Sequence, residues 1–236
     1  MNDVFLSAEW RKLVMANYVI DPSLLIPHLP LKTELDLWEG KCYVSLVAFL
    51  FLNTKIKGMG FPFHKNFEEV NLRFYVKYKE DGEWRRGVVF IREFVPLHMV
   101  TLIANNLYQE KYRTVPMKYH LLENDSKIEL EYYWKKKSWH SFRINAGTHA
   151  EVIADGSERE FITQHFWGYS KKKNYTTEYH VEHEKWKAYE INTYSINVDF
   201  EICYGKEFKW LNGMNPSSVY FVEGSPIKIF KDRKVF

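Results

Sequence analysis

The chain has 236 residues, of which 46% are hydrophobic and 17% aromatic, and its formal net charge is +3. This composition excludes low-complexity disorder, because the chain can bury enough apolar surface to form its own core. The balanced charge argues against nucleic-acid binding, which needs a concentrated basic surface, so no nucleic-acid partner is expected. Length and aromatic content together predict one β-rich domain over residues 1–236.

The first half of the chain is rich in strand signals. A nearly continuous apolar run over 42–52 predicts a strand buried on both faces. Residues 70–79 alternate between apolar and polar side chains, which is the pattern of a strand with two different faces. Asp81 and Gly82 then predict a tight hairpin to a return strand over 84–95.

Helix signals are few. A proline at the first position and apolar residues at helical spacing predict a helix over 96–107. Ser157 and Glu160 have the spacing of a capping box, which predicts a helix over 158–166. A weaker pattern indicates a short helix near 205–211.

The rest of the chain is predicted to be strand, with turn residues between the segments. These segments are 117–122, 127–135, 138–145, 175–183, 186–200, 218–223 and 226–231. Many short strands beside two or three helices favour an antiparallel barrel or a two-sheet β fold with helices attached.

Several blocks of the chain match the pattern of a known family. The most specific blocks are 62–76 and 85–95, and the others are 5–30, 33–47, 104–117, 166–169 and 181–186. Together they resemble the YqjF-like family of uncharacterised bacterial proteins, in the acetoacetate decarboxylase-like superfamily. The resemblance implies a mostly β fold, an antiparallel β-barrel or cone with a central cavity and two or three peripheral helices.

The resemblance implies a comparison with the mechanism of acetoacetate decarboxylases. In these enzymes one lysine forms a Schiff base with the substrate, and a second lysine beside it lowers the pKa of the first. The decarboxylase pattern is Tyr-x-Pro-Lys-Lys, and the similar stretch here runs from Tyr112 to Lys118, with two extra residues between Tyr112 and Pro116. Met117 occupies the first lysine position, and a thioether cannot form an imine. Met117 is therefore a candidate ligand contact in the cavity. Neighbouring strand residues point to opposite faces, so with Met117 in the cavity, Lys118 is expected on the surface.

Polar side chains line one face of the alternating strand. Glu69, Asn71, Arg73 and Tyr75 share this face by the two-residue period. If the face lines a barrel interior, it can hold a small polar or carboxylated ligand, with Arg73 as the bidentate anchor. If it faces solvent, it is an ordinary polar surface. The resemblance also places Glu69 near a cavity glutamate of the decarboxylases, which makes Glu69 the candidate catalytic base.

Three more residues are candidate ligand contacts. Arg92 and Glu93 interrupt an otherwise apolar strand, and a buried charge there needs a partner, so an Arg–Glu pair is expected. That pair is either a structural salt bridge or part of a site. His64 lies in the loop before the polar strand, where rigid strands commonly position site residues.

Metal and cofactor chemistry find no support in the sequence. His180 and His183 fall on opposite faces of a strand, and the chain has no glycine-rich phosphate motif, so neither a metal site nor a cofactor is expected. Cys42 and Cys203 are far apart and in no metal or redox motif, so both thiols are expected to be free. We find no secretory leader and no apolar run of about 18 residues, and we expect a cytoplasmic protein without a membrane partner.

Three functions remain open from the sequence. The first is a binding protein that holds a small molecule in a barrel cavity. The second is an enzyme of decarboxylase-like or hydrolase-like type that uses carboxylate acid–base chemistry without a Schiff-base lysine. The third is an interaction module whose aromatic surface binds another protein or a second copy of the chain.

Overall fold

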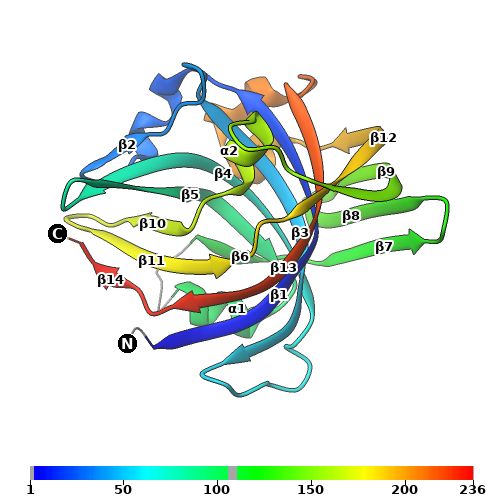
Figure 1. The fold of residues 1–236 in the computed structure, drawn as a ribbon, viewed down its shortest axis with the longest axis horizontal. Coiled ribbons are helices and arrows are strands. Elements are labelled where there is room, and N and C mark those ends of the chain that lie inside the picture. The colour runs from blue at the N-terminus through cyan, green and yellow to red at the C-terminus, as the bar shows by residue number, and fades with distance from the viewer. Residues whose placement is uncertain (1–2, 106–110, 236) are drawn as a thin grey trace.

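A computed structural model describes residues 3–105 and 111–235, and Figure 1 shows long, strongly bent strands that surround a common interior. Seven strands form the wall of this barrel: β1 (Val4–Val19), β3 (Tyr43–Ile56), β4 (Phe67–Glu80), β5 (Glu83–Val95), β10 (Trp167–Lys171), β11 (Thr176–His183) and β13 (Ser218–Phe230).

The barrel closes because the two strands at the ends of the wall, β11 and β13, pair with each other. Neighbours follow the order β11, β10, β5, β4, β3, β1 and β13, and β13 then pairs with β11, with Val181 opposite Ile229. All of these pairs are antiparallel except β5 and β10, which run parallel. The predicted mostly β, antiparallel barrel is therefore confirmed, with one parallel contact that the sequence did not indicate.

The same sheet continues beyond the barrel as an arm. β13 pairs with β12 (Lys187–Asn197), followed in order by β9 (Ser138–Val152), β8 (Ile128–Lys136) and β7 (Met117–Glu123). The buried aromatic side chains of the arm, among them Trp134 and Phe142, share one hydrophobic core with Leu72 and Phe74 of β4. The arm thus covers the outer face of the barrel wall.

Short elements complete the fold. The helices are α1 (His98–Ile103), α2 (Glu158–Thr163) and α3 (Phe200–Tyr204), with 3₁₀ turns η1 (Pro22–Leu24), η2 (Ile26–His28) and η4 (Lys206–Leu211). The short strands are β2 (Thr33–Leu35), β6 (Tyr112–Thr114) and β14 (Arg233–Lys234).

The first two predicted helices exist but are shorter than expected, and the short helix indicated near 205–211 is the 3₁₀ turn η4. The helix predicted over 96–107 begins at His98, because Leu97 has extended backbone, and residues 106–107 of that prediction lie outside the described residues. The helix predicted over 158–166 ends at Thr163. Its capping residue is confirmed, since Ser157 Oγ accepts a hydrogen bond from Glu160 N at 3.2 Å. The Glu160 carboxylate returns to Gly156 N rather than to Ser157 N.

The hairpin between β4 and β5 has the geometry that its turn residues predict. Asp81 and Gly82 both have positive φ, 51° and 89°, as a two-residue turn between twisted strands requires. Glu80 pairs with Glu83 directly beyond the turn. This turn fixes the register of the two strands that carry most of the candidate site.

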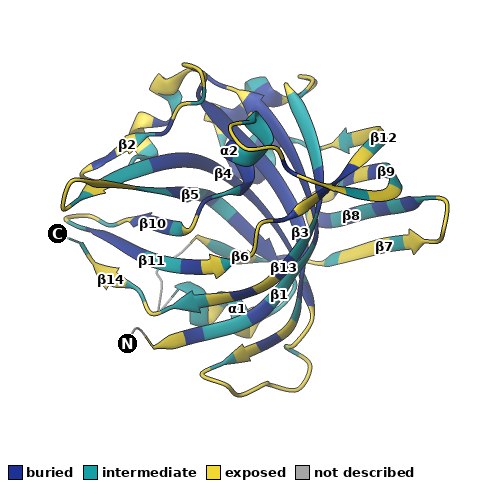
Figure 2. Ribbon diagram, in the orientation of Figure 1, coloured by how far each residue is buried: buried dark blue, intermediate teal, exposed yellow. Residues whose placement is uncertain are grey.

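Both faces of β4 are buried, so neither of them is a solvent surface. Its apolar face, with Val70, Leu72, Phe74 and Val76, packs in the core under the arm. Its polar face, which begins at Glu69, points into the barrel interior. Figure 2 shows the middle of β4 as buried.

Two expectations from composition can be compared with the structure. Cys42 and Cys203 are both buried and free, as expected. Across residues 3–105 and 111–235, no helix has the length and apolar character needed to cross a membrane.

Candidate functional site

The polar row of β4 lies in the barrel interior. Glu69 is 2% exposed, Asn71 1% and Arg73 9%. All three line a small enclosed cavity, together with Glu93 of β5. Of the two orientations that the sequence left open, the structure therefore has the interior one. Buried polar groups of this kind are costly unless they have partners, which makes this cavity the first place to look for function.

A β-bulge decides which charge of β5 enters the cavity. Asn71 pairs with Glu93 and Arg73 pairs with Phe90, so Ile91 is an extra residue on β5. Because of this extra residue, Ile91 and Arg92 both turn outward, and Phe90 and Glu93 both face the interior.

Arg92 is therefore not a cavity residue, contrary to the prediction. Its Nη1 donates a hydrogen bond to the Cys203 carbonyl, on the outer side of the wall. Arg92 and Glu93 are neighbours on β5 and lie on its opposite faces, so an Arg–Glu pair at this position does not join these two side chains to each other.

Glu69 accepts two hydrogen bonds from neighbouring side chains. Tyr112 Oη donates to Glu69 Oε2 at 2.8 Å, and Asn71 Nδ2 donates to Glu69 Oε1 at 2.9 Å. Tyr112 comes from β6, which pairs in parallel with β5 and brings Tyr112 beside Glu93. Burial and the negative charges of Glu69 and Glu93 raise the pKa of Tyr112 well above its usual value. The tyrosine is thus a fixed neutral donor to the glutamate.

The positive charge of Arg73 is compensated much less well than the negative charge of Glu69. Its Nη2 donates to the Ile162 carbonyl at 3.3 Å, and its guanidinium lies 5.7 Å from the centre of the Tyr75 ring. Its Nε is buried and has no hydrogen-bond partner. In the part of the chain that the structure describes, no carboxylate lies within 4.0 Å of this guanidinium. A buried cation in this state is unfavourable unless an anion joins it.

His165 is a cavity residue that the sequence reasoning missed. It follows α2, lines the same cavity, and has both ring nitrogens buried without hydrogen-bond partners. Its Nε2 lies 3.7 Å from Asp36 Oδ2, too far for a good hydrogen bond. Burial, assisted by the positive charges of Arg86 and Arg73, lowers the pKa of His165 to about 4, despite the opposing effect of Asp36. The imidazole is therefore neutral near pH 7.

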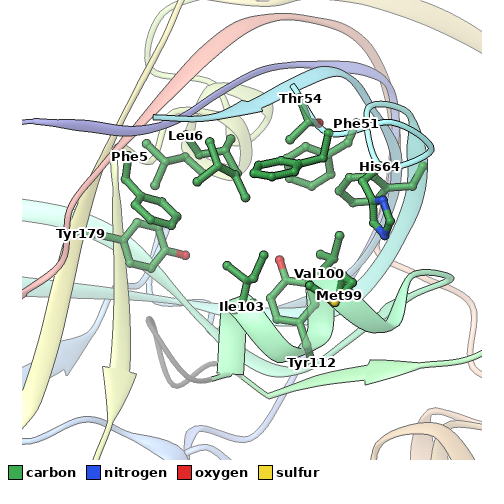
Figure 3. Close-up of a pocket in the computed structure, with 15 residues that line it drawn as sticks. Phe5, Leu6, Phe51, Thr54, His64, Met99, Val100, Ile103, Tyr112 and Tyr179 are labelled. Carbon is green, nitrogen blue, oxygen red and sulfur yellow. The ribbon is translucent and has the colours of Figure 1, made fainter. Parts of the chain in front are cut away.

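Two adjoining cavities occupy this end of the barrel. The inner cavity has a volume of about 60 Å³ and contains the polar row, Glu93 and His165. The outer cavity has a volume of about 180 Å³ and is lined mainly by apolar side chains of β1, β3 and α1 (Figure 3). Four residues line both cavities and form the neck between them: Phe51, Tyr112, Tyr179 and Ile229.

A glycine allows one neck residue to reach its position. Gly168 of β10 pairs with Tyr179 of β11. A Cβ atom added at Gly168 would lie 2.1 Å from Cζ of Tyr179, so the tyrosine ring can lie across β10 only because this residue is glycine. The glycine belongs to the 166–169 block that the sequence singled out, but its role depends on a cross-strand contact.

The remaining sequence candidates lie in different places. His64 lines the outer cavity, and its Nδ1 is 2.8 Å from the Pro62 carbonyl oxygen, away from the polar row. Met117 does not line either cavity, contrary to the prediction, because β7 is the last strand of the arm and Met117 packs in the core outside the barrel. Lys118 is exposed, as expected, with its Nζ 5.0 Å from the Tyr133 ring centre and 5.2 Å from that of Trp139.

Similar folds occur in solved structures of the acetoacetate decarboxylase class. Acetoacetate decarboxylase from Legionella pneumophila aligns with a TM-score of 0.65 at 13% identity, covering 100% of this chain and 90% of that one. The enduracididine biosynthesis enzyme MppR with bound HEPES buffer aligns with a TM-score of 0.66 at 9% identity, over 100% of this chain and 88% of that one. These similarities define an acetoacetate decarboxylase-like β-barrel and leave the chemistry open.

A family model then identifies the chain more closely. The model of DUF2071, described as an uncharacterized conserved protein, matches residues 7–226, so the chain belongs to this family. A curated relative, the uncharacterized protein YqjF of Bacillus subtilis (strain 168), is 27% identical over 110 residues. That alignment covers 46% of this chain and 44% of the relative, so it spans less than half of either protein. The resemblance inferred from the sequence blocks is confirmed.

Proposed function

We propose that this protein binds a small carboxylated molecule in the inner cavity, with Arg73 as the anchor for the carboxylate. The observation that carries the proposal is the state of Arg73, a residue that is only 9% exposed and whose guanidinium has no carboxylate partner among the described residues. A ligand carboxylate can accept two parallel hydrogen bonds from a guanidinium and neutralise its charge. The buried Nε of Arg73, which has no partner, is one of the donors available to it.

The first experiment is native mass spectrometry of the purified protein, followed by denaturation and identification of any released small molecule. Calorimetric titration with acetate, L-lactate and pyruvate then measures binding directly. Arg73→Gln is expected to weaken the binding of these acids by about tenfold to a hundredfold, because it removes a charge-assisted hydrogen bond. Arg143→Gln is the control, since the side chain of Arg143 is 55% exposed on the arm. Equal affinity of Arg73→Gln and the unchanged protein for all three acids would contradict the proposal.

A catalytic role is the second candidate function, and a specific observation favours it. Two buried carboxylates, Glu69 and Glu93, line the same cavity, and Tyr112 holds one oxygen of Glu69 in place. Such a pair can supply a general base and a general acid to a decarboxylase-like or hydrolase-like reaction. No lysine lines either cavity within the described residues, which speaks against Schiff-base chemistry. A screen of keto acids and esters, repeated with Glu69→Gln and Glu93→Gln, tests this candidate.

The interaction-module hypothesis has less support in the geometry. It calls for a filled barrel beneath a large aromatic surface, whereas this barrel encloses cavities that contain polar groups. Self-association stays a prediction, and light scattering of the purified protein over a range of concentrations tests it.

A further inference from the structure

The outer cavity is suited to an apolar group of limited size. Its polar lining is restricted to Thr54, His64 and the two neck tyrosines, and the other side chains around it are apolar. An engineered apolar cavity of about 150 Å³ stays dry and binds benzene, so a volume of about 180 Å³ can hold an aromatic ring or a branched alkyl group. Phe61 and Met99, which are 46% and 51% exposed, mark the side of the cavity that is nearest to solvent.

The outer cavity adjoins the inner cavity, which holds the polar row, at the four neck residues. Figure 3 shows the hydroxyl groups of Tyr112 and Tyr179 pointing into the space that the apolar side chains surround. Tyr112 Oη also donates to Glu69, so one neck residue contacts both environments. A single ligand can therefore extend from one cavity into the other.

The groups between the neck and Arg73 restrict what that ligand can be. Glu69 and Glu93 lie along this path, and each carboxylate has several lone-pair positions that can accept hydrogen bonds. A purely apolar chain beside them would add no hydrogen-bond donor next to these buried carboxylates, which is less favourable than a polar group there. A hydroxyl or ammonium group at this level would donate to them.

We propose that the ligand is an amphipathic acid with three parts in a fixed order. Its carboxylate binds Arg73, a hydrogen-bond donor next to the carboxylate faces Glu69 and Glu93, and an aromatic or branched apolar group occupies the outer cavity. α-Hydroxy acids and α-amino acids with a large apolar side chain have this order. This inference rests on the proposed function, because Arg73 anchors the acid in both.

Four probe acids test the three parts of the proposed ligand separately. Titration calorimetry compares L-lactate, 3-phenylpropionate, 3-phenyllactate and L-phenylalanine. 3-Phenyllactate is expected to bind about tenfold or more tightly than L-lactate, because its ring is buried in the outer cavity. Its affinity is also expected to exceed that of 3-phenylpropionate, which lacks the hydrogen-bond donor. The comparison with L-phenylalanine shows whether the donor is hydroxyl or ammonium.

A matched pair of variants locates the ring. Ile103 lines the outer cavity from α1, whereas its neighbour Leu102 is 55% exposed and does not line it. Ile103→Trp is expected to reduce the affinity for 3-phenyllactate by about tenfold while L-lactate binding stays unchanged. Leu102→Trp should leave both unchanged. Val100→Phe, which fills the same cavity from the same helix, replaces Ile103→Trp if that variant does not unfold cooperatively.

The possible outcomes distinguish this inference from the proposed function. Suppose that Arg73→Gln weakens the binding of L-lactate, but Ile103→Trp and Val100→Phe leave the binding of 3-phenyllactate unchanged. The outer cavity is then not the apolar subsite, and only this inference is overturned. Equal binding of 3-phenylpropionate and 3-phenyllactate overturns the assignment of the donor. If none of the four acids binds, both proposals are wrong.

Discussion

The two faces of β4 are equally buried but differ in what they do. The outer face meets the arm mainly with apolar side chains, and Leu72 and Phe74 there are fully buried in the larger core. The inner face presents Glu69, Asn71 and Arg73 to a cavity of about 60 Å³. One strand thus combines a face that stabilises the fold with a face that is costly to bury. The comparison teaches that burial alone does not separate core from site, whereas hydrogen-bond satisfaction does.

The largest effect is expected on the outer face. Phe74→Ala removes a side chain that is 0% exposed, so we expect the free energy of unfolding to fall by about 3–5 kcal/mol. Urea denaturation followed by tryptophan fluorescence measures this. A loss below about 1 kcal/mol would mean that the arm does not pack tightly on β4.

The second largest effect is a change of stability with pH, and it comes from His165 in the inner cavity. The pKa of His165 is about 4 in the folded protein against 6.5 for an ordinary histidine, so the unfolded chain binds a proton more readily. The stability from this group is fully present above pH 6.5 and is lost as pH falls towards 4, by up to about 3 kcal/mol.

His165→Gln isolates that contribution from other titrating groups. The variant should lose less stability than the unchanged protein between pH 7 and pH 4.5, as measured by urea denaturation at each pH. Parallel pH profiles for the two proteins would show that His165 titrates normally in the fold.

A smaller effect of opposite sign is expected at Arg73. Arg73→Met replaces a buried cation without a carboxylate partner by an apolar side chain of similar length, so we expect stability to rise by about 1–2 kcal/mol. The same variant should lose affinity for small acids. A decrease in stability on this substitution would instead indicate that Arg73 is well compensated in the unliganded protein, and the contrast between the two faces of β4 would weaken.

Lys118, the lysine beside Met117, is expected to form no imine with a keto acid. Lys118 is exposed on the arm, outside the barrel, so borohydride reduction in the presence of acetoacetate or pyruvate should leave the protein mass unchanged. Covalent labelling that disappears in Lys118→Ala would reverse this expectation and bring imine chemistry back.

Local signals in the sequence were enough for much of the fold. The turn at Asp81 and Gly82, the cap at Ser157 and the alternation along β4 each depend on a few neighbouring residues, and the structure contains all three. The family blocks supplied the barrel itself. These features were predictable because short-range stereochemistry determines them.

The site was only partly predictable for a physical reason. Alternation along a strand separates two faces but does not say which one lines an interior, so the polar row could equally have faced solvent. The bulge at Ile91 has no sequence signature, and it decides that Glu93 rather than Arg92 faces the cavity. Tyr112 and His165 reach the cavity from separate segments, which depends on how the strands close.

The pairing of β1 with β13 has a consequence for synthesis of the chain. β1 lies between β3 and β13, and its partners extend from Val4 opposite Phe230 to Asn17 opposite Ser218. The ribosome releases β1 long before β13, so the nascent chain carries an unpaired edge of β1 until the last barrel strand emerges. An exposed strand edge is a template for intermolecular pairing. Until β13 is made and pairs with it, β1 is therefore the strand edge at which two unfinished chains are most able to associate.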